Sequence, residues 1–307
     1  YVWHAEFWRR IGDEGMAARL LRSIDHIAPS ETVRSQLSTL DPVRIERAED
    51  APPEWTGEFC PRVLIVCHEH SDYGLDTLYD GLVQLLGIDR VVEFPWKPTL
   101  HGQSPEMAHG YPCTFNHPGE PTSLEWVCAQ LQEKAFDLVF YADTLLELDA
   151  NMVRRILEAA GDTPLFIVDT WDDGGDYLQD TLDHIGRTSA HAYFKREMLQ
   201  CAQYPPRTYP LPFSYPMDRV PQTLSAPRTL PLFWAGKRQD GLRRLYLEHL
   251  ESRLGVDLKV RYVQEEYARV LEMALIGLNL FGLGFDTVRY WELPAHGCLL
   301  LSERPPI

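Results

Sequence analysis

The 307-residue chain lacks features that define several large classes of protein. No apolar run reaches the ~18 residues of a membrane-spanning helix, and no basic-then-apolar leader is present. Its 29 Lys and Arg residues face 45 Asp and Glu residues, giving a net charge of −16. The surplus of cations that nucleic-acid binding requires is therefore missing. The sequence predicts neither a transmembrane segment nor a nucleic-acid partner.

The chain also lacks paired cysteines and the common catalytic motifs of hydrolases, P-loop proteins and nicotinamide enzymes. No Cys-x-x-Cys pair occurs, which favours neither a disulfide framework nor a zinc site and predicts a reducing, cytoplasmic location. No Gly-x-Ser-x-Gly elbow or Walker loop occurs, and the segment 282–287 matches only the first two glycines of a dinucleotide fingerprint. The six cysteines are Cys60, Cys67, Cys113, Cys128, Cys201 and Cys298.

Apolar runs and amphipathic helical patterns alternate along most of the chain. The run RVLIVC is typical of a buried parallel strand, and the helical pattern after it ends at Gly87. This alternation predicts parallel sheets wrapped by right-handed crossover helices. It restarts after residue 229 with the strand PLFWAG, a helix, the strand VDLKVRYV, a helix and the strand IGLNLFG. A polar insertion over residues 95–120 is long enough to predict a functional or mobile loop.

The same pattern predicts two open α/β domains. Residues 1–59 are expected to form a helical lead-in, or the remnant of a preceding helical module, and 60–215 a first Rossmann-like domain. A proline-rich linker is predicted over 216–228, because proline fixes φ and removes a backbone donor. Residues 229–307 would form a second, incomplete Rossmann-like domain of a longer protein. Ligands bind at the carboxyl ends of strands in such sheets, so we expect a site in the cleft between the domains.

The segment Gly282–Gly297 combines a glycine-rich turn with a short helix. A helix N-terminus offers unpaired N–H groups and partial positive charge to an anion, and a carboxylate one turn later suits vicinal hydroxyls. Arg289, Glu292 and His296 follow at spacings of three and four, on one helix face. A diphosphate–ribose site is predicted, with a surface ion pair as the alternative. Pro294 predicts a kink, or a helix that begins after Thr287.

This segment carries a family resemblance. The string RYWELPAHGCLLLSE resembles the nucleotide-binding helix of group 1 glycosyltransferases of GT-B architecture, through an Arg-x-x-Glu-x-x-Ala-x-Gly pattern at Arg289, Glu292, Ala295 and Gly297. It is most similar to the bacterial subset related to spore-maturation glycosyltransferases. The resemblance implies two domains facing a cleft, a nucleotide-sugar donor and no cofactor. No Asp-x-Asp pair, which metal-dependent GT-A transferases use, occurs here, so metal-independent transfer is expected.

The resemblance also implies roles for individual residues. Glu292 would bind the ribose, and cations at a strand's carboxyl end would offset the departing diphosphate, with a solvated basic helix face as the alternative. Retaining members commonly carry two glutamates separated by seven residues; here the first position is Gly284, and Asp286 lies nearby. The retaining or inverting outcome stays open. The predicted donor site comprises Gly236, Lys237, Arg238, Arg243, Gly284, Asp286, Thr287, Arg289 and Glu292.

Two clusters in the first domain are candidates for the acceptor side. His68, Glu69, His70 and Asp72 follow the first strand, where one of them would deprotonate an acceptor hydroxyl. Metal ligation and satisfaction of loop backbone groups are the alternatives. In the second cluster, VDTWDDGGDY, four aspartates would bind a cation or cap a helix. Its Trp171 would stack on an acceptor sugar or belong to the core.

Together these features predict a glycosyltransferase that moves a sugar from a nucleotide-sugar donor to a glycan, protein or small-molecule acceptor. His68, His70 and Asp72 are its predicted catalytic residues. A nucleotide-sugar epimerase on the same scaffold is one alternative. A non-catalytic module that binds nucleotide sugars or glycans is another, suggested by Gly284.

Overall fold

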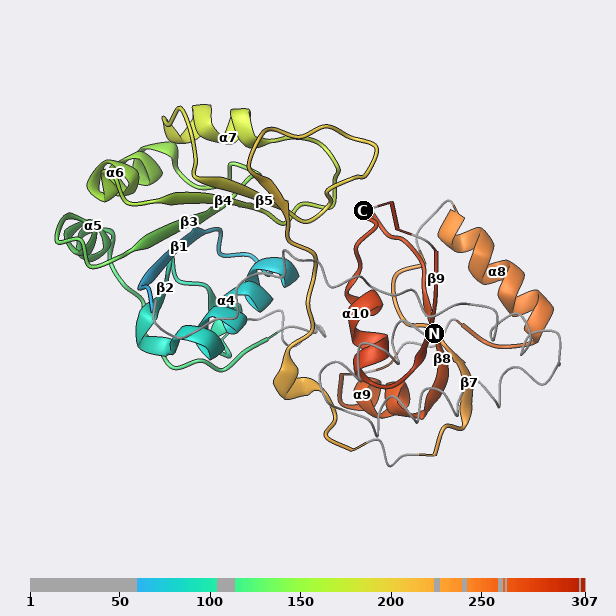
Figure 1. Ribbon diagram of the computed structural model, residues 1–307. Coiled ribbons are helices and arrows are strands. Elements are labelled where there is room, and N and C mark those ends of the chain that lie inside the picture. Colours follow the sequence, from blue (N-terminus) through green and yellow to red (C-terminus); the bar gives the residue numbers. More distant parts are fainter. Residues whose placement is uncertain are drawn as a thin grey trace, which may run out of the picture. The chain divides into compact units, whose positions relative to one another are not determined.

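A computed structural model describes residues 60–103, 114–223, 227–238, 242–258, 262, 264–303, 305 and 306. The helical lead-in predicted over 1–59 lies outside the described residues, as does the middle of the polar insertion. The described chain forms two units, each built on a parallel sheet (Figure 1). The N-terminal unit comprises residues 60–219, 281–291 and 303–307, and the C-terminal unit comprises 220–280 and 292–302.

The N-terminal unit is a six-stranded parallel sheet with the order β2-β1-β3-β4-β5-β6. Because β1 pairs with both β2 and β3, the strand order reverses beside β1, and this switch point is where open α/β sheets bind ligands. The strands are β1 (Val63–Cys67), β2 (Val91–Phe94), β3 (Leu138–Ala142), β4 (Leu165–Asp169), β5 (Ala192–Lys195) and β6 (Thr208–Pro210). The helices are α4 (Tyr73–Leu86), α5 (Leu124–Gln132), α6 (Ala150–Ala160) and α7 (Leu178–Ile185), with 3-10 turns at Ile88–Arg90, Pro98–Leu100 and Met217–Arg219.

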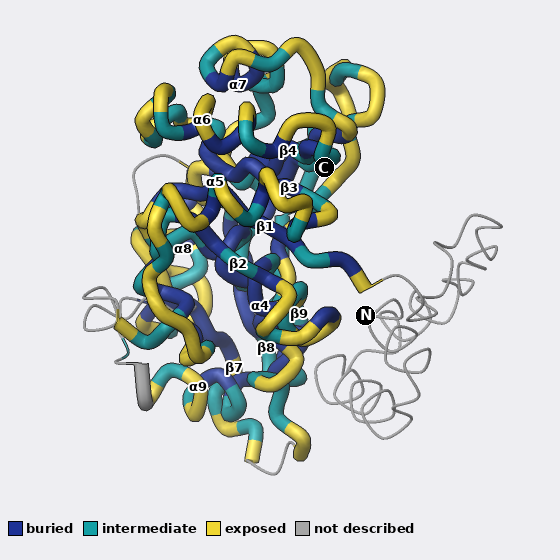
Figure 2. Tube along the Cα trace, turned by 90° about the vertical axis from the view of Figure 1, so that its left-hand side faces the viewer, coloured by how far each residue is buried: buried dark blue, intermediate teal, exposed yellow. Residues whose placement is uncertain are grey.

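Helices cover both faces of this sheet, as the alternating pattern predicts. Leu64 and Val66 of β1 pack into a cluster with α5, α6 and α7, whereas Ile65 packs with α4 on the other face. All five residues of β1 are buried, because side chains alternate between two covered faces. Figure 2 shows the strands mainly buried and the outer sides of the helices exposed. The predicted Rossmann-like, parallel α/β character of this part is confirmed.

A proline-containing segment that precedes the predicted linker contributes the outermost strand of this sheet, β6. Thr208–Pro210 pairs in parallel with β5 and has no second neighbour in the sheet. Proline is tolerated on an edge strand, where the missing N–H costs no ladder bond. Among the described residues, the chain first passes to the C-terminal unit between Arg219 and Val220, and it crosses between the units again after residues 280, 291 and 302.

The C-terminal unit is a three-stranded parallel sheet with the order β7-β8-β9. The strand predicted from VDLKVRYV is not observed: the described residues 256–258 and 262 carry no strand, and the others lie outside the described residues. The strands are β7 (Leu230–Phe233), β8 (Ala274–Asn279) and β9 (Leu299–Ser302), and two helices, α8 (Leu242–Leu254) and α9 (Gln264–Met273), lie wholly within this unit. Helix α10 (Val288–Ala295) is divided: its residues up to Trp291 belong to the N-terminal unit, and those from Glu292 on belong to the C-terminal unit.

Helix α10 begins directly after Thr287 and includes Pro294. Gly297, with φ of 72°, follows it and donates its N–H to the Pro294 carbonyl at 2.9 Å, so it ends the helix as predicted. Leu293 packs closely on β8, where a Cβ at Gly277 would lie 2.2 Å from its Cδ2. Only glycine permits this contact between α10 and the sheet.

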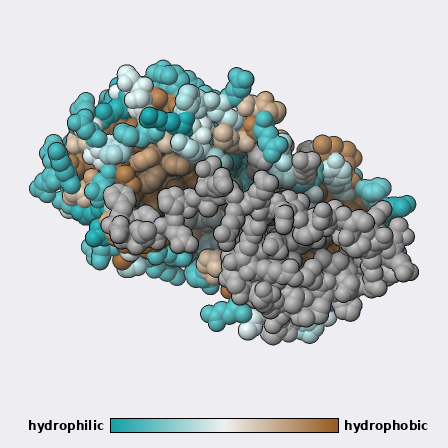
Figure 3. Space-filling view, viewed as in Figure 1, coloured by the Kyte–Doolittle hydropathy of each residue, from teal (hydrophilic) through white to brown (hydrophobic). Residues whose placement is uncertain are grey.

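The surface and the cysteines show no membrane segment and no cross-link in the described chain. No described helix combines the length and apolar character needed to cross a bilayer. The five described cysteines are all free thiols. Figure 3 shows hydrophilic residues around the visible periphery of the N-terminal unit, with apolar residues gathered toward its middle.

Candidate functional site

A pocket of about 320 Å³ opens at the carboxyl ends of β1, β3 and β4, at the switch point of the N-terminal sheet. Its walls come from three loops: His68–Tyr73 after β1, Ala142–Glu147 after β3 and Thr170–Asp172 after β4. Arg196 and Phe213 complete the lining. All these residues belong to the N-terminal unit. The pocket, named here the switch-point pocket, contains the three predicted catalytic residues.

His68 and Asp72 form a pair at the base of this pocket. His68 Nε2 lies 3.4 Å from Asp72 Oδ2, which also accepts a hydrogen bond from the Thr170 hydroxyl. The other carboxylate oxygen caps α4 by accepting the N–H of Leu75 at 3.1 Å. Burial alone would raise the pKa of Asp72, but the hydrogen bonds from His68, Thr170 and Leu75 outweigh it and lower that pKa. Asp72 is therefore an ionised carboxylate that orients His68.

A buried lysine supports the loop that carries these histidines. Lys97 is fully buried and donates to the carbonyl oxygens of His68, at 3.3 Å, and His70. Its Nζ also lies 3.4 Å from Asp76 Oδ1 in α4. Burial raises the pKa of Asp76 to about 6, against the opposing effect of Lys97. Lys97 was not predicted as a site residue; the lysine between Trp96 and a proline just after a strand was the available signal.

The rim of the switch-point pocket is exposed. His70 is 71% exposed and its Nε2 lies 3.3 Å from Glu147 Oε2. Trp171 is 41% exposed, and its backbone N–H donates to Asp169 Oδ1 at 2.9 Å. Trp171 is thus a rim residue and does not belong to the core; its stacking on an acceptor sugar stays a prediction.

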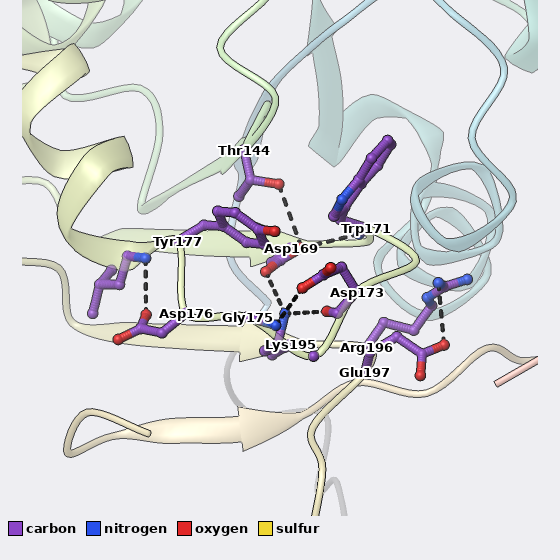
Figure 4. Close-up of polar contacts among 12 residues, drawn as sticks. Thr144, Asp169, Trp171, Asp173, Gly175, Asp176, Tyr177, Lys195, Arg196 and Glu197 are labelled. Carbon is purple, nitrogen blue, oxygen red and sulfur yellow. Dashed lines mark hydrogen bonds and ion pairs between the residues drawn. The ribbon is translucent and has the colours of Figure 1, made fainter. Parts of the chain in front are cut away.

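Most of the aspartate cluster is committed to internal contacts (Figure 4). Asp169, at the end of β4, accepts a hydrogen bond from Lys195 Nζ at 2.8 Å and another from the Tyr193 hydroxyl. Asp173 and Asp176 accept backbone N–H groups in the loop before α7. Across the described chain, no three His, Cys, Asp or Glu side chains converge on a possible metal position.

The glycine turn before α10 is closed by an internal carboxylate. Glu197 is fully buried and accepts the N–H groups of Phe285, at 3.0 Å, and Asp286, at 2.9 Å. A Cβ at Gly284 would lie 2.3 Å from Glu197 Oε1, so only glycine fits beside this carboxylate. Burial raises the pKa of Glu197, while Arg196 and the two N–H groups oppose that rise. Two backbone N–H groups of the glycine turn before α10 are therefore already bonded.

The remaining predicted donor residues of the N-terminal unit lie close to that turn. Asp286 is buried and accepts hydrogen bonds from the N–H of Phe213 and from Trp291 Nε1, the latter at 2.8 Å. Burial raises the pKa of the Asp286 carboxyl. Thr287 and Arg289 are partly buried. Asp286 thus fixes the start of α10 against the chain around Phe213.

In the C-terminal unit, two of the predicted cations are engaged by the protein itself. Arg238 forms a two-bond fork with Glu251, at 3.0 and 2.9 Å. Arg243 donates to the carbonyl oxygens of Lys237 and Leu280, both at 3.0 Å. Lys237 and Gly236 are exposed. These contacts join the loop after β7 to the helix and strand that follow it.

Glu292 is also buried in this unit, with 4% of its surface exposed. It accepts the hydroxyl of Tyr267 in α9 at 2.6 Å. His296, predicted on the same helix face, is buried as well, and burial followed by the charge of Arg228 lowers its pKa to about 4. His296 is therefore neutral near pH 7.

The predicted residues thus fall into three groups. The catalytic candidates line one pocket, four donor residues lie in the N-terminal unit and five in the C-terminal unit. No known family model matches the chain, and no curated protein or solved structure is detectably similar to it. The residues missed at the sequence level are Lys97, Arg196 and Glu197.

Proposed function

We propose that the protein is a GT-B glycosyltransferase that moves a sugar from a nucleotide-sugar donor to an acceptor hydroxyl held in the switch-point pocket. The observation that carries this proposal is the His68–Asp72 pair, oriented by Thr170, in a pocket at a sheet switch point. The resemblance of Arg289–Gly297 to a nucleotide-binding helix supports the choice of donor. Trp171 at the rim suits a sugar face.

In the proposed reaction the acceptor oxygen attacks the anomeric carbon and its proton passes to the His68 imidazole. The bond from the anomeric carbon to the diphosphate oxygen breaks, and its electron pair leaves with the nucleoside diphosphate. Asp72, ionised and hydrogen-bonded to His68, stabilises the imidazolium that forms. Lys237 is the exposed cation proposed to offset the leaving diphosphate.

On the donor side, Glu292 is proposed to contact the ribose. Its hydrogen bond from Tyr267 fixes the carboxylate at the C-terminal part of α10. Replacing Glu292 by Gln should weaken nucleotide-sugar binding, measured by calorimetry. Tyr267→Phe, which removes this one hydrogen bond but keeps the carboxylate, is the matched variant and should have a smaller effect. Unchanged affinity in Glu292→Gln would contradict the donor assignment.

The acceptor half of the proposal is tested at His68. His68→Ala should lower kcat by about 10²–10⁴-fold, measured as nucleoside diphosphate release with a panel of acceptors. The exposed His249 in α8 supplies the control variant, His249→Ala, which should behave as wild type. A His68→Ala enzyme with wild-type kcat would exclude His68 as the base. Donor incubated alone and recovered as a different sugar would instead identify an epimerase.

One observation favours a second candidate, a non-catalytic binding module. Glu197 already bonds the N–H groups of Phe285 and Asp286, which leaves fewer donors for a diphosphate at this turn. Tight nucleotide-sugar binding without turnover, for every acceptor tested, would support this candidate over the transferase.

A further inference from the structure

A second pocket, of about 250 Å³, lies beside the first in the N-terminal unit. Its walls are mainly apolar and include Pro210, Pro212 and Pro305 together with the aromatic rings of Tyr290 and Trp291. Such walls suit the apolar face of a ring, and a small number of polar groups then fixes its orientation. Asp286, Tyr290 and Trp291 belong to the predicted donor segment, but no residue with a role in the reaction proposed above lines this pocket, named here the proline pocket.

Arg196 lines both the proline pocket and the switch-point pocket. Its side chain is only 2% exposed, yet no described residue accepts a hydrogen bond from its Nε. Both of its ion pairs, with Asp172 and with Glu197, use the single nitrogen Nη2. A buried guanidinium with donors left over is a poorly satisfied group, and arginine pairs best with a planar anion through two parallel bonds.

The two carboxylates on Arg196 differ in how firmly they are held. Glu197 is fully buried and also accepts two backbone N–H groups, so it stays in place. Asp172 is 43% exposed and has Arg196 as its sole hydrogen-bond partner among the described residues. Of the two, Asp172 is the carboxylate that a ligand anion can replace.

Asp172 lines the switch-point pocket, and Arg196 is the residue that the two pockets share. We propose that the proline pocket binds a sugar-sized ring bearing one anionic group, carboxylate or phosphate, which pairs with Arg196 in place of Asp172. Asp286 also borders the pocket, but both of its oxygens are occupied, by the N–H of Phe213 and by Trp291 Nε1. Burial raises the pKa of the Asp286 carboxyl, while the hydrogen bonds from Phe213 and Trp291 oppose that rise. The site does not depend on transferase activity.

The proposal is tested by calorimetric titration of the intact protein with glucuronate, glucose 6-phosphate and neutral glucose. Both acids should bind and glucose should not, and their relative affinities identify the preferred anion. Asp172→Asn removes the competing carboxylate and should tighten binding of the acids by about tenfold, the effect of one charge-assisted hydrogen bond. Equal binding of glucose and the acids, or unchanged affinity in Asp172→Asn, would overturn the proposal.

Four further variants test whether binding of the acids depends on Arg196. Arg196→Gln should abolish binding of the acids, and Arg196→Lys, which keeps the charge but loses the fork, should weaken it. The exposed Arg155 in α6 supplies the matched control, Arg155→Gln, with wild-type binding. His68→Ala should also bind the acids normally, which separates this site from the proposed base. Normal binding by a folded Arg196→Lys together with normal binding by Asp172→Asn would exclude Arg196 as the anion partner.

Discussion

The two units of the chain use their cations in different ways. In the N-terminal unit, Lys97 and Lys195 lie beneath the carboxyl ends of the strands and hold the loops around an open pocket. In the C-terminal unit, Arg238 and Arg243 sit at an equivalent strand end but bind Glu251 and backbone carbonyls of the unit itself. Both pockets described above are lined entirely by the N-terminal unit.

A basic residue at a strand's carboxyl end is therefore not by itself evidence that the residue binds a ligand. The position brings the side chain to the edge where ligands bind in α/β sheets. Whether it can meet a ligand depends on the partners that the local fold already supplies. In the C-terminal unit, Lys237 remains exposed while Arg238 is held by a fork of two hydrogen bonds.

The largest loss of stability is expected on removal of Lys97 from the N-terminal unit. Lys97→Met leaves the buried Asp76 carboxylate without its cation and two loop carbonyls without their donor. We expect a loss of about 3–5 kcal/mol in the free energy of unfolding, measured by urea denaturation, because breaking a buried ion pair strands a charge.

Two controls define this result. Arg155→Met removes an exposed ion pair with Glu125 and should change stability by no more than about 0.5 kcal/mol. The double variant Lys97→Met with Asp76→Leu should recover part of the loss, since no buried charge remains. A single Lys97→Met variant as stable as wild type would show that the loop does not depend on this lysine.

A pH titration tests the buried histidine of the C-terminal unit. His296 has a pKa of about 4 in the folded chain, against an ordinary value of 6.5, because it is buried near Arg228. Below pH 6.5 the unfolded chain gains a proton that the folded chain does not, so stability falls as the pH drops toward 4. The expected loss is about 3 kcal/mol.

His296→Gln should remove that part of the pH dependence, seen as a flatter plot of unfolding free energy between pH 7 and 4. His249→Gln, at an exposed position in α8, should keep the wild-type plot. The same slope in wild type and His296→Gln would mean that His296 is protonated in the folded chain.

The strands and helices of the N-terminal unit could be predicted because their signals are local. Buried runs such as Val63–Cys67 and capping residues such as Asp72 and Gly87 mark where each element begins or ends. The edge strand at Thr208–Pro210 could not, because its pairing with β5 is decided by distant residues while its prolines argue against a strand.

The site was predictable only where one loop carries it. His68 and Asp72 lie four residues apart after one strand, so their pairing follows from the local chain. Glu197 and Gly284 are distant in sequence, and nothing in either segment indicates that the carboxylate closes the glycine turn. Lys97 likewise acts on a loop almost thirty residues earlier, which no spacing rule detects.

A smaller effect on stability is expected at Arg238, and it tests whether the ion pair with Glu251 stabilises the C-terminal unit. Arg238→Met should lower stability by about 1 kcal/mol, because the fork with Glu251 is partly exposed, with 27% and 15% of the two side chains accessible. Thermal unfolding of Arg238→Met, of Glu251→Gln and of the double variant gives the interaction energy between the two side chains. Additive effects of the two changes would contradict a direct pair.

The smallest effect on stability is expected at Lys237, the exposed cation in the loop after β7. Lys237 is exposed and its side chain makes no hydrogen bond or ion pair with the described residues, so Lys237→Ala should leave the unfolding free energy within about 0.5 kcal/mol of wild type. If Lys237 meets the donor diphosphate, nucleotide-sugar affinity measured by calorimetry should still fall about threefold to tenfold. Lost affinity at unchanged stability would separate Lys237 from Arg238 and Arg243. Unchanged affinity would leave the C-terminal unit without a cation for the diphosphate among the three predicted there.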